Sequence, residues 1–337
     1  MHNLEKLYLS YFGTAANSCE PLKGDGSDRQ IFRLHGPSKT CIGIYGNNDA
    51  ENKAFVNFTR HFFSFNLPVP EIYITDLENQ IYLEEDLGYD TLFDWMSRIR
   101  TKDGFNEKII SAYCAALERL PEFQITAGKS IDFSYCYQHD SFAKESMLWD
   151  LEYFRHRFLD NFYNKTYDHD ELEKDMLNLV NHLEEEKPHY FLYRDFQSRN
   201  IMILDERPHF IDYQSGRRGA LQYDVASLLY DAKANIPQDI RDNLLEHYLE
   251  KLSSFVKIDN KRFKYYFPGF VLIRIMQAFG AYGYLSTVKG KKHFLKSVPF
   301  AIRNLEIMLE KDITLNNFPT LRKIFSDLVT DKSLREF

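Results

Sequence analysis

The first third of the chain alternates short apolar runs with turn-forming residues. Between two such groups of runs, ENKAFVNFTRHFF (51–63) places its apolar residues at helical spacing. The runs themselves are rich in β-branched and aromatic residues and are bounded by Gly, Pro, Asn or Ser, which is typical of strands. They are RQIFRL (29–34), CIGIY (41–45), EIYIT (71–75) and QIYLEE (80–85). We therefore expect a small antiparallel sheet with one packed helix.

Helical patterns dominate from about Asp90 onward. Apolar residues recur there at steps of four, three and four, as in Met147, Leu151, Phe154 and Phe158. One stretch departs from this pattern: IMIL and HFIDY flank the polar link DERP (205–208), and together they predict a β-hairpin. The patterns predict an α+β protein with a small sheet lobe followed by a mainly helical lobe.

Composition and charge argue against several classes of protein. The chain has 337 residues, of which 44% are hydrophobic and 27% charged, as in soluble globular proteins. The net charge of −7 gives no basic field for nucleic acid, and no segment has the pattern of a secretion signal or a membrane span. Four cysteines without a CxxC pair indicate reduced thiols. We expect a cytoplasmic location, no nucleic-acid or membrane partner, and no obligate protein partner.

Three polar residues stand in apolar surroundings between residues 191 and 214. Asp195, Asn200 and Asp212 lie at the start and end of the predicted hairpin, which would bring them to one place. An aspartate that accepts a hydroxyl proton, with an Asn and a second Asp that hold Mg²⁺, is the set that phosphoryl transfer uses. The alternative is structural: Asp195 caps a local turn, and backbone N–H groups satisfy Asp212 at a strand end.

The segments around these residues resemble a known superfamily. YRDFQSRN is similar to the catalytic loop of the aminoglycoside phosphotransferase and choline kinase superfamily, relatives of protein kinases, with Tyr193 where a His usually stands. FIDYQ resembles the metal-binding Asp segment of that superfamily. Other similar segments are the nucleotide-covering loop KGDGSDRQIFRL (23–34), the hinge YLEEDLG (82–88) and the helix LQYDVASLLYD (221–231).

This resemblance implies a two-lobed protein-kinase-like fold, with a nucleotide-binding lobe over 1–86 and a helical lobe over 87–337. It implies ATP and Mg²⁺ as cofactors, Asp195 as the catalytic base, and Asn200 and Asp212 as metal ligands. Asp224 would support the catalytic loop. The remaining nucleotide-binding residues would be Gly24, Asp25, Gly26 and Ser27 over the phosphates, Glu84, Glu85, Asp86 and Leu87 beside adenine, and Glu51 on the small-lobe helix.

One expected residue is missing. The superfamily pairs the helix glutamate with a lysine on the third strand, and CIGIY has neither Lys nor Arg. Arg29 and Arg33 lie on one face of the preceding strand, and either could bind phosphate in place of that lysine. Two solvent-facing arginines on an exposed strand are the alternative.

The substrate is the least defined feature. Within the superfamily, residues 216–231 and 274–299 most resemble bacterial anomeric kinases that act on N-acetylmuramate and N-acetylglucosamine, which implies a small amino sugar as substrate. Aminoglycoside or choline-type phosphorylation, and a non-catalytic nucleotide-binding scaffold, remain alternatives. The candidate substrate residues are Arg199, Gln214, Arg217, Arg218, Arg274 and Gln277. For the Arg217–Arg218 pair a solvated basic turn is the competing interpretation, and Arg274 and Gln277 could instead satisfy neighbouring helix ends.

Overall fold

The computed structural model describes residues 2–22, 24, 26, 28–100, 104–311 and 313–337. Its contacts divide the chain into two compact units, which are described separately below. The first consists of Met1–Asp140 and Tyr193–Arg217, and the second of Ser141–Leu192 and Arg218–Phe337. The first unit therefore extends past residue 86, and the predicted lobe boundary at that residue stays a prediction.

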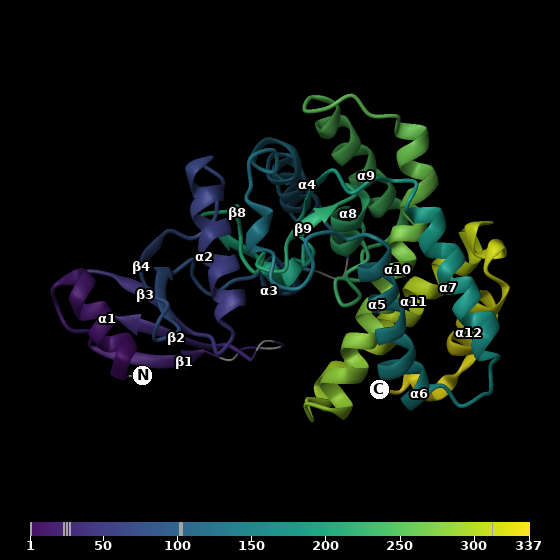
Figure 1. The fold of residues 1–337 in the computed structure, drawn as a ribbon, viewed down its shortest axis with the longest axis horizontal. Helices are drawn as coiled ribbons and strands as arrows, with labels where there is room; N and C mark the ends of the chain where they lie inside the picture. Colours follow the sequence, from purple (N-terminus) through teal and green to yellow (C-terminus); the bar gives the residue numbers. More distant parts are fainter. Residues whose placement is uncertain (1, 23, 25, 27, 101–103, 312) are drawn as a thin grey trace. The chain divides into compact units, whose positions relative to one another are not determined.

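The first unit is built on an antiparallel sheet (Figure 1). The sheet has five strands in the order β1-β2-β3-β5-β4. The four predicted strands are confirmed to within about a residue at each end, because their β-branched and aromatic residues pack on both faces of the sheet. A fifth strand, β1, was not predicted and forms one edge. The strands are β1 (Ser18–Leu22), β2 (Gln30–His35), β3 (Thr40–Tyr45), β4 (Ile72–Asp76) and β5 (Ile81–Glu85).

Two helices cover this sheet, where the sequence predicted one. The unpredicted helix α1 (His2–Phe12) buries Leu4, Leu7 and Tyr8 against Phe32, Leu34 and Leu83 in a shared core. The predicted helix α2 (Asp49–Ser64) begins where the side chain of Asn48 accepts a hydrogen bond from the backbone N–H of Glu51. Phe55 of α2 stacks on Tyr82 of β5, and successive residues of a strand face opposite ways. Tyr82 and Glu84 therefore lie on the α2 side of the sheet, away from α1.

The predicted hairpin follows as β7 (Ile201–Leu204) and β8 (Arg207–Phe210), paired from Ile201 opposite Phe210 to Leu204 opposite Arg207. Its connecting turn has two residues, Asp205 and Glu206, both with positive φ, and not the four predicted. Pro208 can remain in the strand because each strand of a two-stranded hairpin has an unpaired edge. The helices of this unit besides α1 and α2 are α3 (Leu92–Ile99), α4 (Glu107–Pro121), the π-helical η1 (Glu122–Ala127), and the 3₁₀ turns η2 (Phe133–Tyr135) and η4 (Ser198–Asn200).

The second unit is mainly helical, as predicted. Its longest helix, α10, packs against α5, the π-helical η3 and α8. Gly280 and Gly283 permit this packing, since a Cβ at Gly283 would collide with the backbone oxygen of Arg157 and one at Gly280 with the ring of Tyr153. The helices are α5 (Lys144–Phe154), η3 (Arg155–Leu159), α6 (Asp160–Phe162), α7 (His169–Leu183), α8 (Gln222–Leu229), α9 (Gln238–Ser253), α10 (Asn260–Thr287), η5 (Lys292–Ser297), α11 (Val298–Lys311), η6 (Ile313–Asn317), α12 (Pro319–Thr330) and η7 (Lys332–Arg335).

The second unit also contains a two-stranded sheet of β6 (Tyr190–Leu192) and β9 (Arg217–Gly219), the latter beginning on the last residue of the first unit. Across the described ranges of both units, no helix combines the length and the apolar character that crossing a lipid bilayer requires.

Candidate active site

The structure brings the three central polar residues together within the first unit. The side-chain amide of Asn200 donates two hydrogen bonds, to the backbone oxygen of Asp195 at 2.9 Å and to Oδ2 of Asp212 at 3.1 Å. The hydroxyl of Tyr193 donates to the backbone oxygen of Ile211 at 2.5 Å, which ties the start of this loop to the residue before Asp212. The hairpin thus returns the chain to its starting point, as the sequence predicted.

Two residues of this loop system have strained backbones. Arg194 has a φ of 82° and Asp212 a φ of 70°, a left-handed conformation that residues other than glycine rarely adopt. Such conformations cost about 1–3 kcal/mol each and persist where the surrounding structure holds them. Here one stands directly before Asp195 and the other is Asp212 itself.

Asp212 is the centre of a ring of charged and amide groups. Its Oδ1 accepts from Arg29 Nη2 at 2.5 Å and from Gln214 Nε2 at 2.8 Å. Arg29 Nε lies 3.5 Å from Glu51 Oε1, and Gln214 Nε2 also reaches that oxygen at 3.4 Å. The predicted residues Arg29, Glu51, Asp212 and Gln214 therefore form one network, which links the start of β2, helix α2 and the segment after the hairpin.

Electrostatics hold the Arg29 guanidinium charged. Burial acts to lower the pKa of Arg29, but Tyr82, Asp212 and Glu51 outweigh that effect and raise the pKa above its usual value. Burial likewise raises the pKa of Glu51, with Arg29 opposing it. Only 8% of the Arg29 side chain is exposed. The cation is therefore largely desolvated, and it lies between the carboxylates of Glu51 and Asp212.

Glu84 lies on the same side of the sheet and is buried. Among the described residues its Oε2 has no hydrogen-bond partner. Burial raises its pKa from the ordinary 4.5 to about 8, with Arg29 opposing the shift and Asp212 adding to it. The folded carboxyl thus keeps its proton to a higher pH than the unfolded one. Its contribution to stability is full below about pH 4.5 and is lost as pH rises through about 8.

Arg33 takes a different role from Arg29. It is 3% exposed, and its guanidinium donates to both carboxylate oxygens of Asp86, at 2.7 and 2.9 Å, and to the backbone oxygen of Gly88 at 2.6 Å. It also lies over the ring of Tyr89, 3.7 Å from the centroid. These bonds commit Arg33 to the predicted hinge segment. Asp86 also accepts from the Gly88 N–H, where a φ of 88° favours glycine.

The other predicted nucleotide-binding residues lie nearby in the chain. Leu87 is buried, and the carboxylate of Glu85 accepts from the backbone N–H of Glu71 at 3.3 Å. Gly24 and Gly26 are exposed, and no atom lies within 4 Å of a Cβ placed on Gly26. The two remaining loop residues, Asp25 and Ser27, lie outside the described residues.

The predicted substrate residues separate into two groups. In the first unit, Arg199 lies 4.1 Å from the centroid of the Phe93 ring, and Arg217 is 2% exposed. In the second unit, Arg274 Nε donates to Ser227 Oγ at 2.9 Å, and its Nη1 donates to Gln277 Oε1 at 2.7 Å. Arg218, also in the second unit, is exposed. Asp224, which was predicted to support the catalytic loop, is fully buried in α8 of the same unit. Their roles stay predictions.

One segment of the first unit was missed by sequence reasoning. Residues 136–138 are held against the chain that follows Asp212, because Cys136 Sγ contacts the backbone oxygen of Gly216 at 3.2 Å and Arg217 Nη2 donates to Gln138 Oε1 at 2.8 Å. Tyr137 lies between them, with its hydroxyl 3.4 Å from Ser215 Oγ. No motif or spacing signals this contact, which joins residues about 80 positions apart in sequence.

The side-chain oxygens of Asn200 and Asp212 suit a hard cation that takes few ligands from the protein. Asn200 uses its amide nitrogen for Asp195 and Asp212, so its oxygen is the end that remains for a metal ion. In the described part of the chain, no three His, Cys, Asp or Glu side chains gather closely enough to enclose a metal. Mg²⁺ commonly binds through one or two protein oxygens, with substrate phosphates and water as its other ligands. Asn200 and Asp212 suit that mode.

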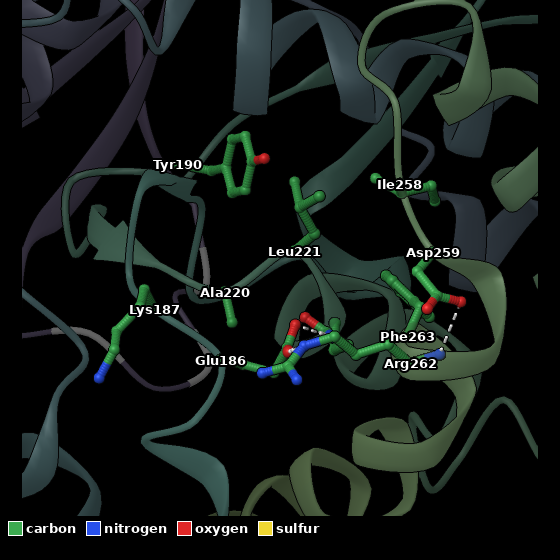
Figure 2. Close-up of a pocket in the computed structure, with 10 residues that line it drawn as sticks. Glu186, Lys187, Tyr190, Ala220, Leu221, Ile258, Asp259, Arg262 and Phe263 are labelled. Carbon is green, nitrogen blue, oxygen red and sulfur yellow. Dashed lines mark hydrogen bonds and ion pairs between the residues drawn. The ribbon is translucent and has the colours of Figure 1, made fainter.

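The second unit has a small pocket, and none of the residues of the Asp212 network lines it. Figure 2 shows Arg262 reaching Glu186, whose carboxylate accepts from Arg262 Nε at 2.5 Å and from Gln222 Nε2 at 2.9 Å. Asp259, at its rim, caps the first turn of α10. Arg262 and Glu186 neutralise each other, and Asp259 caps the helix. These charged groups therefore give no indication of a ligand.

Comparison with known proteins defines the class. The sequence profile of the phosphotransferase enzyme family (APH) matches residues 18–259, and the chain belongs to this family. It is an enzyme, a small-molecule phosphotransferase, as the catalytic loop indicated.

Two of the relatives that the chain resembles in sequence are sugar kinases of Pseudomonas species. The chain is 25% identical over 293 residues to the N-acetylmuramate/N-acetylglucosamine kinase of Pseudomonas aeruginosa, covering 85% of this chain and 82% of that one. It is 23% identical to the enzyme of the same name from Pseudomonas putida, covering 84% and 81%.

Among solved structures it resembles the choline kinase LicA from Streptococcus pneumoniae, with a TM-score of 0.53, 13% identity and coverage of 98% and 99%. It also resembles the ADP-bound aminoglycoside phosphotransferase APH(2'')-Ib, with a TM-score of 0.55, 14% identity and coverage of 99% for each chain. These similarities confirm the predicted protein-kinase-like fold.

Proposed function

We propose that this phosphotransferase transfers the γ-phosphoryl group of ATP, with Mg²⁺, to the anomeric hydroxyl of an N-acetylated amino sugar. The observation that carries the proposal is the pair of hydrogen bonds from Asn200, which holds the Asp195 backbone and the Asp212 carboxylate around one point. The named activity of the Pseudomonas relatives supports the choice of acceptor.

Each residue has a defined part in this reaction. The Asp195 carboxylate accepts the proton of the sugar hydroxyl as the oxygen attacks phosphorus. Mg²⁺, held by Asn200 and Asp212, would neutralise charge on the phosphates. Arg29 supplies the cation that the third strand lacks, and Glu51 and Gln214 hold it and Asp212 in place. Arg33 keeps the hinge segment rigid through Asp86.

The side chains of Tyr137, Gln138 and Arg217 favour a neutral or anionic acceptor over a cationic one. Tyr137 and Gln138 are uncharged and Arg217 is cationic, whereas recognition of choline or an aminoglycoside calls for several carboxylates facing the acceptor. Amide, aromatic and guanidinium groups of this kind suit a sugar.

Transfer of labelled phosphate from [γ-³²P]ATP tests this function. The acceptors are N-acetylglucosamine, N-acetylmuramate, glucosamine, kanamycin and choline, each with Mg²⁺ and with EDTA. We expect transfer to the two N-acetylated sugars only, dependent on Mg²⁺, and a product that loses its phosphate in mild acid, as anomeric phosphates do and primary phosphate esters do not. Preferred transfer to kanamycin or choline, or an acid-stable sugar phosphate, would contradict the proposal.

A further inference from the structure

Tyr137 lies beside the proposed catalytic residues without a part in the chemistry described so far. It is half-buried, and Glu51, Asp195 and Asp212 all act on its hydroxyl electrostatically. The segment that carries it is fixed by the contacts of Cys136 and Gln138 to residues 216 and 217. The hydroxyl is therefore held against the segment that directly follows Asp212, with Ser215 Oγ 3.4 Å away.

A chain of hydrogen bonds determines which way this hydroxyl points its proton. Arg217 can only donate, so the Gln138 atom 2.8 Å from it is the amide oxygen. The other end of that amide, Nε2, then faces the Tyr137 oxygen at 3.1 Å and must donate to it. The Tyr137 oxygen thus accepts from Gln138, and its own proton is directed elsewhere.

The hydrogen bond that this hydroxyl can donate within the protein is weak. Among the described residues, the only other group in hydrogen-bond range is Ser215 Oγ at 3.4 Å, well beyond the usual 2.7–2.8 Å of a hydroxyl pair. Burial raises the pKa of Tyr137, Ser215 opposes the shift, and the three carboxylates add to it, so the phenol stays protonated at neutral pH. A ligand oxygen at ordinary distance would replace the long bond to Ser215.

We propose that Tyr137 is an acceptor-binding residue, whose hydroxyl donates a hydrogen bond to an oxygen of the acceptor sugar beside the hydroxyl that is phosphorylated. Gln138 and Arg217 are positioning residues that orient this donor. The proposal rests on the proposed function and extends it to a specific contact with the sugar.

The test measures steady-state kinetics with N-acetylglucosamine as the varied acceptor for the parent, Tyr137→Phe and Gln138→Leu. Loss of one hydrogen bond to a neutral group predicts a rise of about 3- to 10-fold in the acceptor KM for Tyr137→Phe. The KM for ATP and the thermal shift with ATP should stay at parent values. Gln138→Leu, which removes the orienting donor and keeps the hydroxyl, should raise the acceptor KM by a smaller factor. It also keeps the proposal testable if Tyr137→Phe does not fold.

Tyr135→Phe is the matched control. This exposed tyrosine stands two residues earlier in the same segment, and loss of its hydroxyl should leave all constants unchanged. An acceptor KM for Tyr137→Phe within 1.5-fold of the parent, or a fall in kcat alone, overturns the proposal, the latter pointing to the transferred phosphoryl group as the contact. A parent that does not phosphorylate N-acetylglucosamine contradicts the proposed function and this contact with it. An active parent with an unchanged variant contradicts the Tyr137 contact alone.

Discussion

Replacement of Arg29 is the perturbation that most directly examines how this family member binds phosphate without the strand lysine. Arg29→Ala removes a guanidinium that lies 2.5 Å from Asp212 and 3.5 Å from Glu51 and is 8% exposed. The phosphates of ATP would then be met by metal and backbone groups alone.

The magnitude follows from the burial of this cation. A hydrogen bond to a charged group contributes about 1.5–3 kcal/mol, or roughly 10- to 150-fold in affinity. We therefore expect the KM for ATP to rise about tenfold or more in Arg29→Ala. Arg29→Lys keeps the charge but loses the planar fork that suits paired phosphate oxygens, and it should recover part of that loss. A surface arginine, by comparison, contributes about 0–1 kcal/mol.

The assay combines the KM for ATP at saturating acceptor with the dissociation constant of Mg·ADP from calorimetry. Arg60→Ala is the control, because Arg60 is an exposed cation of the same unit, on helix α2. It should change neither constant. If Arg29→Ala binds and turns over ATP within twofold of the parent, Arg29 is not a phosphate ligand, and its pairs with Glu51 and Asp212 serve structure alone.

Two further predictions concern metal and pH. Asp212→Ala and Asn200→Ala should each reduce the Mg²⁺-dependent part of the thermal shift with ATP, and a parent shift that is equal with Mg²⁺ and with EDTA would count against a metal site. Glu84→Gln should flatten the fall in unfolding free energy between about pH 5 and 8, a slope of at most about 1.4 kcal/mol per pH unit, because the raised pKa of about 8 makes the folded state hold the extra proton. Urea unfolding at several pH values measures this, and a slope matching that of the surface control Glu78→Gln would refute it.

The sequence predicted the elements whose patterns are local. The four predicted strands and α2 carry strong periodicity, and the predicted catalytic loop is a contiguous motif. The edge strand β1 was missed because SCEPL mixes polar residues and Pro21 into a half-exposed strand, which leaves little alternation to detect. Helix α1 did carry a signal, since Leu4, Leu7 and Tyr8 follow at steps of three and one, but its short amphipathic face was not recognised.

Long-range partners account for what the sequence could not supply. Arg29 and Arg33 lie on the same face of a strand and were equal candidates. The fold gives them different partners. Arg29 bonds Asp212, which is 183 residues away in sequence, and Arg33 bonds Asp86, which is 53 residues away. Tyr137 and Gln138 had no motif at all, since their respective partners Ser215 and Arg217 are distant in sequence. Pairings of this kind depend on packing of the whole unit and leave no trace in a local pattern.

The central claim is that Asp195 is the base of a phosphoryl transfer, and single-turnover transfer from [γ-³²P]ATP to N-acetylglucosamine by Asp195→Asn tests it most directly. The substitution keeps the size of the side chain and removes its ability to accept the sugar proton. We predict a fall in the transfer rate of about 10² to 10⁴, with the thermal shift on ATP binding retained. Transfer within threefold of the parent rate would contradict the account.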